Sequence, residues 1–237
     1  MALDTPAHGD ADIIKAQAKI KEVLEEWIPI YVAAQEPNNP EVQYPGYFDT
    51  FYSLTPTIAE DPDHGYDKYT NVDNHELYCQ GHFMEAAVAH YRYTKHATGT
   101  GDTRLLDVAV KSANHIVNTF GDGVNQRRQI PGHQEIELAL MKLAKLCKEI
   151  GGEYEDNADA YIDKAAYFLE LRGNTEGRTA DIRDDQRQYY QDFAPVSQQT
   201  VALGHAVRAQ YMYTGMCELA SIKPEFAAKY NNALTTL

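Results

Sequence analysis

The sequence has little positive charge. Its 21 lysines and arginines stand against 35 aspartates and glutamates, which gives a net charge of −14. Nucleic acids and anionic membranes are both bound through basic patches, so this balance argues against either as a partner. An acidic surface suits a neutral or cationic ligand, although most acidic proteins are acidic only for solubility.

Cysteines are few, and long apolar runs are absent. Cys79, Cys147 and Cys217 each fall within a helical pattern, and none belongs to a CxxC pair. An odd number without a paired framework predicts reduced, buried thiols. No apolar run approaches a membrane span, and the first residues lack the basic and apolar regions of a signal peptide. We expect no membrane partner; the compartment, cytoplasmic or periplasmic, stays open.

Familiar catalytic signatures are also missing. The sequence contains no Ser-His-Asp order, no phosphate-binding glycine loop and no dinucleotide fingerprint. Tyrosine, in contrast, is abundant, with 17 residues. Tyrosines can line carbohydrate sites, because each offers a flat apolar face and a hydroxyl, but most of these are expected to pack between helices.

Apolar residues recur at three- and four-residue spacing over most of the chain, which predicts helices. Pro29 should kink or end the first of them. The segments 35–74 and 172–196 lack this period and are predicted to be long loops, which in compact domains are often functional. The expected helices cover residues 10–34, 75–98, about 105–117, about 136–150, about 157–171, 197 to about 216, and 224–237.

The helices follow one another as hairpins with irregular spacing and almost no strand between them. Irregular spacing disfavours a strict solenoid, whose repeat length is fixed. It favours an all-α toroid in which inner and outer helices alternate and the loops at one end build the site. The sequence supplies fewer hairpins than a closed ring requires, so we expect it to be an incomplete part of such a barrel.

Three Gly-His pairs each open an apolar helical stretch. Because consecutive hairpins alternate in direction, every second helix starts at the same end, and the three histidines should gather around one mouth. A helix N-terminus disfavours positive charge, so the imidazoles should be neutral, each with one donor and one acceptor that suit a sugar hydroxyl. The pairs are Gly81-His82, Gly132-His133 and Gly204-His205.

The stretch before the first pair contains a second interpretation. On a helix, His75, Cys79 and His82 share one face, so a His/Cys/His metal site is conceivable there. However, Gly81 would then stand in mid-helix and no fourth ligand is in sight. The commoner explanation is a helix start whose polar side chains contact neighbouring loops, and we predict no metal in this chain.

Two acids follow the second pair. Glu135 and Glu137 flank an apolar residue at the expected helix start, where carboxylates favour the helix dipole. In the functional interpretation His133 lies at the tip and one glutamate binds a hydroxyl or orients the imidazole. Both interpretations are open at this point.

The same stretches resemble a known family. HELYCQGHFMEAAVAHYRYT, PGHQEIELALMKL and QDFAPVSQQTVALGHAVRAQYMYTGM are similar to glycoside hydrolase family 127, a bacterial family once described as a domain of unknown function. The upstream run Tyr44-Pro45-Gly46-Tyr47-Phe48-Asp49-Thr50 resembles an altered form of a Gln-Pro-Asp-Gly-Tyr-Leu-Asn-Thr-like segment of that family. The best known members are β-L-arabinofuranosidases, and the resemblance covers nearly all of residues 10–222.

The resemblance implies an (α/α)6 barrel followed by β-sandwich domains, and retaining hydrolysis of non-reducing-end β-L-arabinofuranosides. In the family the nucleophile is a zinc-bound cysteine, a glutamate is the acid/base, and one glutamate with three cysteines holds the zinc. These residues would lie beyond Leu237, and the three cysteines here match none of them. We therefore expect residues 1–237 to be a partial barrel without catalytic residues or zinc, unable to hydrolyse glycosides alone.

What the resemblance carries over is carbohydrate binding. The family's sugar-binding histidines match His82, His133 and His205. Pocket-lining or supporting candidates are His75, Glu135 and Asp192. Because part of a toroid leaves helix faces uncovered, we also expect poor solubility or self-association.

Three alternatives stay open. The first is another α/α-barrel carbohydrate enzyme, such as a sugar epimerase or an unsaturated uronyl hydrolase. The second is a non-enzymatic helical-repeat interaction module, which predicts that the three histidines lie on unrelated surfaces. The third is a naturally truncated relic. Within the family, the sugar and the linkage are not fixed by these residues.

Overall fold

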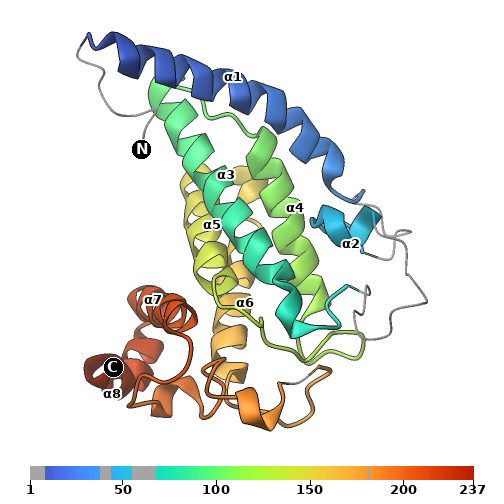
Figure 1. Ribbon diagram of the computed structural model, residues 1–237, viewed down its shortest axis with the longest axis vertical. Helices are drawn as coiled ribbons and strands as arrows, with labels where there is room; N and C mark the ends of the chain where they lie inside the picture. The colour runs from blue at the N-terminus through green and yellow to red at the C-terminus, as the bar shows by residue number, and fades with distance from the viewer. Residues whose placement is uncertain (1–8, 38–43, 55–67, 181) are drawn as a thin grey trace.

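The structure, a computed structural model, describes residues 9–37, 44–54, 68–180 and 182–237 (Figure 1). In these ranges the chain is helical, and its β-pairing is limited to an isolated bridge between Phe120 and Arg127. The all-α prediction is therefore confirmed. The α-helices are α1 (Ala11–Ala34), α2 (Thr50–Leu54), α3 (Glu76–Thr98), α4 (Arg104–Thr119), α5 (Ile136–Ile150), α6 (Ala158–Leu171), α7 (Ala206–Ile222) and α8 (Pro224–Thr236).

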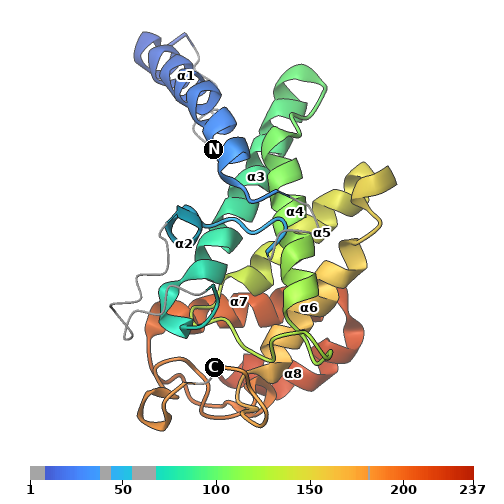
Figure 2. The ribbon, with the colours of Figure 1, turned by 90° about the vertical axis from the view of Figure 1, so that its right-hand side faces the viewer.

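Helices α3 to α8 form three successive hairpins. Within the hairpins α3 packs on α4, α5 on α6 and α7 on α8, while α3, α5 and α7 also pack in a row through α5. Helix α4 contacts α6 on one side and α1 on the other. Helices α7 and α8 run across the direction of α3 to α6, at the end where the long loop lies (Figure 2). This alternation of two helical layers is the arrangement of an α/α barrel.

The helix ends follow local rules that the sequence makes visible. Gly99 ends α3 with φ 81° and donates its N–H to the Lys95 carbonyl, a left-handed cap that glycine adopts without steric cost. Gly151 ends α5, and Pro224 occupies the first turn of α8, where its missing N–H has no partner to lose. The Asp102 carboxylate, one residue before the N-cap Thr103 of α4, accepts from the Arg104 N–H at 2.9 Å.

Two predictions for the first 74 residues need correction. Helix α1 continues past Pro29 to Ala34, so of the two effects predicted for this proline, a kink or an end of the helix, the end is wrong. The short helix α2 and a 3-10 turn, η1 (Val72–Asn74), lie in the segment 35–74 that was predicted as loop. Residues 35–37, 44–49 and 68–71 of this segment are not helical, as predicted, and residues 38–43 and 55–67 lie outside the described part of the chain.

Helix α7 begins at Ala206, not at Ser197. The chain before it makes two further 3-10 turns, η3 (Asp184–Gln186) and η4 (Val196–Gln198), and no α-helix. The Gln191 side chain donates to the carbonyls of Leu203 and His205 and so ties the chain just before α7 to the loop. The loop that starts at Arg172 therefore extends to His205.

The core lies between the two helical layers, and α5 contributes most to it. Cys147 of α5 is fully buried there, but Cys79 and Cys217 are exposed. The expectation of three buried thiols is thus right for one cysteine only. On α3 the neighbours Leu77 and Gln80 face inward, which turns Cys79 outward. No helix among the described residues combines the length and the apolar character that a membrane span requires.

Candidate functional site

Four imidazole rings gather at the end of the fold where α3, α5 and α7 begin. The His133 ring centre lies 5.6 Å from that of His75 and 6.2 Å from that of His205. The ring of Tyr78 links His82 to this row, at 4.4 Å from His82 and 4.3 Å from His133. The three Gly-His histidines therefore meet at one rim, as the spacing predicted, and the alternative in which they lie on unrelated surfaces is wrong. We call this set the imidazole cluster: His75, Tyr78, His82, His133, His205 and Tyr211.

The histidines occupy different positions relative to their helices. His205 is the N-cap of α7, where its Nδ1 accepts from the Arg208 N–H at 3.4 Å. His133 lies in the loop just before α5. His82, in contrast, lies in the second turn of α3, because that helix already begins at Glu76. The prediction that Gly81-His82 opens a helix is therefore wrong.

The glycines of the later two pairs allow backbone segments to touch. A Cβ on Gly132 would lie 1.6 Å from the Val72 carbonyl oxygen, so only glycine permits this segment to pass beside η1. A Cβ on Gly204 would lie 1.9 Å from the Gln188 oxygen, and its φ of +81° is unfavourable for other residues. The residue after each glycine is thereby brought to the rim.

Two cluster tyrosines were not singled out from the sequence. Tyr211 of α7 lies with its ring centre 5.7 Å from that of His133, and its hydroxyl is 3.5 Å from Nε2 of His82. Tyr78 precedes His82 by four residues on α3, a spacing that puts both side chains on one helix face. That spacing was the signal available in the sequence. The two rings add flat apolar surface to the polar imidazoles.

The hydrogen bonds of the cluster fix which imidazole nitrogens are free. Nδ1 of His133 lies 2.7 Å from the Gln134 carbonyl oxygen, and Nδ1 of His75 lies 2.6 Å from the Asp73 carbonyl oxygen. A carbonyl only accepts, so both Nδ1 atoms carry the proton and both Nε2 atoms are left as acceptors. His205 uses Nδ1 as the acceptor and keeps Nε2–H as a donor. The rim thus offers both kinds of hydrogen-bonding group.

His133 is held neutral. Its pKa is lowered to about 4, mainly by burial and also by the nearby Arg208, His75 and His205, while the hydrogen bond to the Gln134 carbonyl acts in the opposite direction. A neutral imidazole was expected at this position, and for His133 that expectation is confirmed. The main cause is desolvation instead of the helix dipole, because uncharged imidazole loses less on leaving water than imidazolium does.

Two buried arginines fix the loop that carries His133. Arg172 donates to the carbonyls of Tyr190 and Pro131, each at 2.8 Å. Arg208 donates to the Gly132 carbonyl and stacks on the Tyr190 ring, with 4.4 Å between guanidinium carbon and ring centre. The segments of His133 and His205 are therefore held by the same side chains.

Asp192, a predicted binding residue, lies outside the imidazole cluster. Its carboxylate is fully buried and accepts from Arg178, Arg187 and the Gly173 N–H, with bonds of 2.7 Å. These partners engage both oxygens, so of the two predicted roles, lining the pocket or supporting it, the geometry favours support. Its role is to hold the loop between α6 and α7.

Glu135 lies behind the cluster. Its side chain is fully buried, and Oε1 lies 3.7 Å from Nδ1 of His82. The pKa of Glu135 is raised to about 8, mainly by burial and also by the nearby Glu85 and Glu137, while Lys142 acts in the opposite direction. Of the predicted candidates, His75, His82, His133, His205 and Glu135 therefore lie together, and only Asp192 lies apart.

One set of metal-ligand side chains occurs among the described residues, and it differs from the His75, Cys79 and His82 set considered from the sequence. His82, Glu85 and Glu135 place one ligand atom each within 4.8 Å of one another. The Lys142 ammonium forms an ion pair with Glu85, so this corner already contains a cation. An imidazole and two carboxylates could coordinate a divalent ion only by displacing that lysine.

An open groove of about 430 Å³ adjoins the cluster. It lies between α3, α5 and α7 and shares Tyr211 with the cluster. A ligand at the imidazoles can extend into it. The groove is lined by Glu85, Leu138, Lys142, Ala206, Val207, Gln210, Tyr211 and Thr214.

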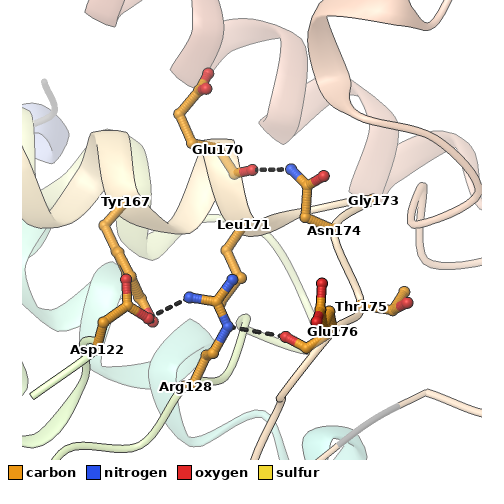
Figure 3. A pocket seen from close by; sticks show the side chains of 9 residues that line it. All are labelled: Asp122, Arg128, Tyr167, Glu170, Leu171, Gly173, Asn174, Thr175 and Glu176. Carbon is orange, nitrogen blue, oxygen red and sulfur yellow. Dashed lines mark hydrogen bonds and ion pairs between the residues drawn. The ribbon is translucent and has the colours of Figure 1, made fainter.

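A second hollow, of about 450 Å³, lies at the C-terminal end of α6 (Figure 3). Several of its polar side chains are engaged with one another or with the backbone. Arg128 pairs with Asp122 and donates to the Glu176 carbonyl at 2.9 Å, and Asn174 donates to the Glu170 carbonyl at 2.6 Å. The groove that shares Tyr211 with the imidazole cluster is therefore the better candidate for a binding site.

The alternating helical layers, with their polar rim at one end, define an α/α-barrel protein of the carbohydrate-active type, and the comparisons with known proteins agree. The family model described as "Beta-L-arabinofuranosidase, GH127 catalytic domain" matches residues 7–234. The chain therefore belongs to glycoside hydrolase family 127.

Its relatives are longer proteins. A curated non-reducing end β-L-arabinofuranosidase of Bifidobacterium longum subsp. longum is 30% identical over 195 residues, which cover 76% of this chain and 27% of the relative. The crystal structure of a GH127 β-L-arabinofuranosidase from Geobacillus stearothermophilus T6 matches with a TM-score of 0.72 and 33% identity, over 100% of this chain and 33% of that one. A second GH127 β-arabinofuranosidase structure gives a TM-score of 0.72 and 34% identity, over 93% and 30%. The chain thus spans about a third of their length.

Proposed function

We propose that this chain forms the sugar-binding wall of an enzyme that hydrolyses non-reducing-end β-L-arabinofuranosides with retention. The observation that supports the proposal most strongly is the convergence of His82, His133 and His205, which lie on α3, before α5 and at the N-cap of α7, respectively. Family membership and the names of the relatives supply the substrate class.

The chemistry of the rim suits a neutral sugar. Nε2 of His75 and Nε2 of His133 accept, and Nε2–H of His205 donates, so hydroxyls can be bound in both senses. The rings of Tyr78 and Tyr211 offer apolar surface for the C–H face of a furanose. A neutral His133 adds no charge that would require a counter-ion in the ligand.

The catalytic chemistry is not assigned to this chain. The zinc and cysteine nucleophile that the family resemblance implies need three cysteines and a glutamate together. Here Cys147 is buried in α5, Cys79 and Cys217 are exposed on α3 and α7, and the ligand group that the structure brings together contains no cysteine. These residues do not fit that zinc site. We expect the chain alone to bind the sugar without turnover.

The proposal is tested by titrating the chain with methyl β-L-arabinofuranoside and following histidine ring signals by NMR. Signals of the cluster histidines should shift on binding, and His133→Ala should weaken binding more than tenfold, because a buried sugar hydroxyl loses its partner. His96→Ala, in the exposed last turn of α3, is the matched control and should change nothing. Equal binding by wild type and His133→Ala would contradict the assignment.

We also expect self-association through the uncovered face of α1. Trp27 and Ile30 of this helix are 50% and 61% exposed, which is unusual for large apolar side chains on an isolated surface. Sedimentation velocity should detect oligomers that the double variant Trp27→Gln and Ile30→Gln reduces. A monodisperse wild-type monomer would contradict this expectation.

A further inference from the structure

The carboxyl group of Glu135 is buried without a hydrogen-bond partner. Its side chain has no exposed surface, and neither oxygen has a partner among the described residues. Leaving a buried acceptor unpaired costs about 1–3 kcal/mol, more for a charged group. A group that costs stability and stands beside a binding site calls for a role in that site.

The surroundings of Glu135 favour its protonated form. On α3 it faces His82 and Glu85, on α5 it faces Glu137 and Lys142, and the Tyr211 hydroxyl approaches from α7. Burial is the largest influence, and the two carboxylates outweigh the single ammonium, so the pKa of Glu135 rises to about 8. At neutral pH the carboxyl group then has an O–H to donate.

Gly81 brings the histidine and the acid together. A Cβ at Gly81 would lie 2.9 Å from Cγ of Glu135 and 3.2 Å from the backbone nitrogen of Ile136. Only a residue without a Cβ lets the second turn of α3 lie directly against the first residue of α5. The following residue, His82, is thereby placed with Nδ1 beside the carboxyl group, at 3.7 Å from Oε1. Gly81 therefore does not start a helix; it allows α3 to approach α5 closely.

We propose that Glu135 is a positioning residue for His82: its carboxyl O–H donates to Nδ1 and fixes the tautomer whose Nε2–H is free to donate. Nε2 is the atom that lies 3.5 Å from the Tyr211 hydroxyl, on the ligand side of the ring. The separation of 3.7 Å is longer than a hydrogen bond, so the proposal requires the two side chains to approach by about 0.5–1 Å in the free protein as well as in the complex.

This inference deepens the proposed function and rests on it for the identity of the ligand. His82 then donates to a sugar hydroxyl, and Nε2 of His133 accepts from one. The pair supplies opposite hydrogen-bonding senses on the two sides of Tyr78. A buried neutral carboxyl group fixes which ring nitrogen of His82 donates, without placing a charge at the site.

The tautomer of His82 is measured by NMR on the chain labelled with ¹⁵N-histidine, without ligand. The signals of His82 are those lost in His82→Gln. In the wild type at pH 7, Nδ1 should be the unprotonated nitrogen and Nε2 the protonated one. A protonated Nδ1 in the wild type would overturn the proposal, because Glu135 would then be the acceptor.

Two variants separate positioning from packing. Glu135→Gln keeps the size and has an N–H₂ that can donate to Nδ1, so the tautomer should be retained; Glu135→Leu has no donor and should give mixed tautomers. Glu149→Leu, at the exposed end of α5, is the matched control and should leave His82 unchanged. An unchanged His82 tautomer in Glu135→Leu would overturn the proposal.

The ligand titration provides the second readout. Affinity for methyl β-L-arabinofuranoside should fall about tenfold in Glu135→Leu and less than about twofold in Glu135→Gln. Equal losses in both would show that Glu135 acts only through packing. If the arabinoside binds none of the proteins, the proposed function fails, whereas the ligand-free tautomer measurement still decides the role of Glu135.

Discussion

The imidazole cluster and the hydrogen bonds around Asp192 lie at the same end of the fold, but their polar groups are used differently. Asp192 accepts from Arg178, Arg187 and Gly173, and both its oxygens are engaged. In the cluster, the ring of His82 is 41% exposed, and its nearest polar atoms stand at 3.5 and 3.7 Å. The first region has no spare hydrogen-bonding capacity, and the second has a great deal.

Hydrogen-bonding groups without a partner therefore indicate a binding role better than the mere presence of polar residues in a loop. The segment 172–196 is rich in aspartate and arginine, and its Asp192 was named, from the family resemblance, as a residue that lines or supports the pocket. Once folded, those charges neutralise one another inside the loop. The imidazoles, which are hard to pair with each other, keep nitrogens for a ligand.

The variant Asp192→Asn tests this contrast with the largest expected effect. Removing one partner of a buried ion pair leaves Arg178 uncompensated, so the free energy of unfolding should fall by about 3–5 kcal/mol. Chemical denaturation followed by circular dichroism measures it. Asp184→Asn, which removes an exposed partner of Arg187, should cost less than about 1 kcal/mol. Comparable losses in the two variants would contradict the contrast.

A second test concerns the backbone approach at Gly204. Gly204→Ala should destabilise the protein by about 2–4 kcal/mol, because the added Cβ meets the Gln188 carbonyl and the backbone is left-handed. Gly99→Ala is a matched control with the same φ of +81° and nothing within 4 Å, and should cost only about 1–2 kcal/mol. Thermal melts of both variants separate the cost of the steric clash from the cost of the left-handed backbone.

A third test uses the pH dependence of stability. Because the folded pKa of Glu135 is raised to about 8 from the usual 4.5, its contribution to stability is complete below pH 4.5 and is lost as pH rises through 8. Glu135→Gln removes this loss, so it should be more stable than wild type at pH 8.5 by about 2 kcal/mol and equal or less stable at pH 5. Parallel pH profiles of stability for the two proteins would contradict the raised pKa of Glu135.

The smallest effect is expected on the acid side. The pKa of His133 is lowered to about 4 from 6.5, so stability is complete above pH 6.5 and falls as pH decreases toward 4, where the folded ring begins to take up a proton. Buried His115, with a pKa of about 4, adds to the same loss. His133→Asn should flatten the profile between pH 6.5 and 4 by about 1 kcal/mol, as measured by denaturation at each pH.

Much of the fold is predictable because helix ends are marked by local chemistry. Gly99, Gly151 and Pro224 set boundaries that the apolar period alone would leave vague. The start of α7 was missed because Val201 continues the apolar period of the helix although it lies in the loop. The side chain of Gln191, which holds that loop, bonds to carbonyls more than ten residues away, and no local pattern contains such information.

The convergence of the histidines could be predicted from the sequence, but the contacts that hold their surroundings in place could not. Alternating hairpin directions were sufficient to bring His82, His133 and His205 to one rim. Exposure depends on how helices rotate against one another, which explains why Cys79 was assigned to the wrong environment. The engagement of Asp192 by two arginines from its own loop likewise requires the folded backbone.

Because the imidazole cluster lies where α3, α5 and α7 begin, the turns at the opposite end of the hairpins are remote from it. The turns between α3 and α4 and between α5 and α6 project there, away from the long loop before α7 (Figure 2). Such exposed connections tolerate insertion well. A peptide tag introduced at Thr100 or Glu153 would therefore allow the protein to be immobilised with its imidazole cluster directed outward.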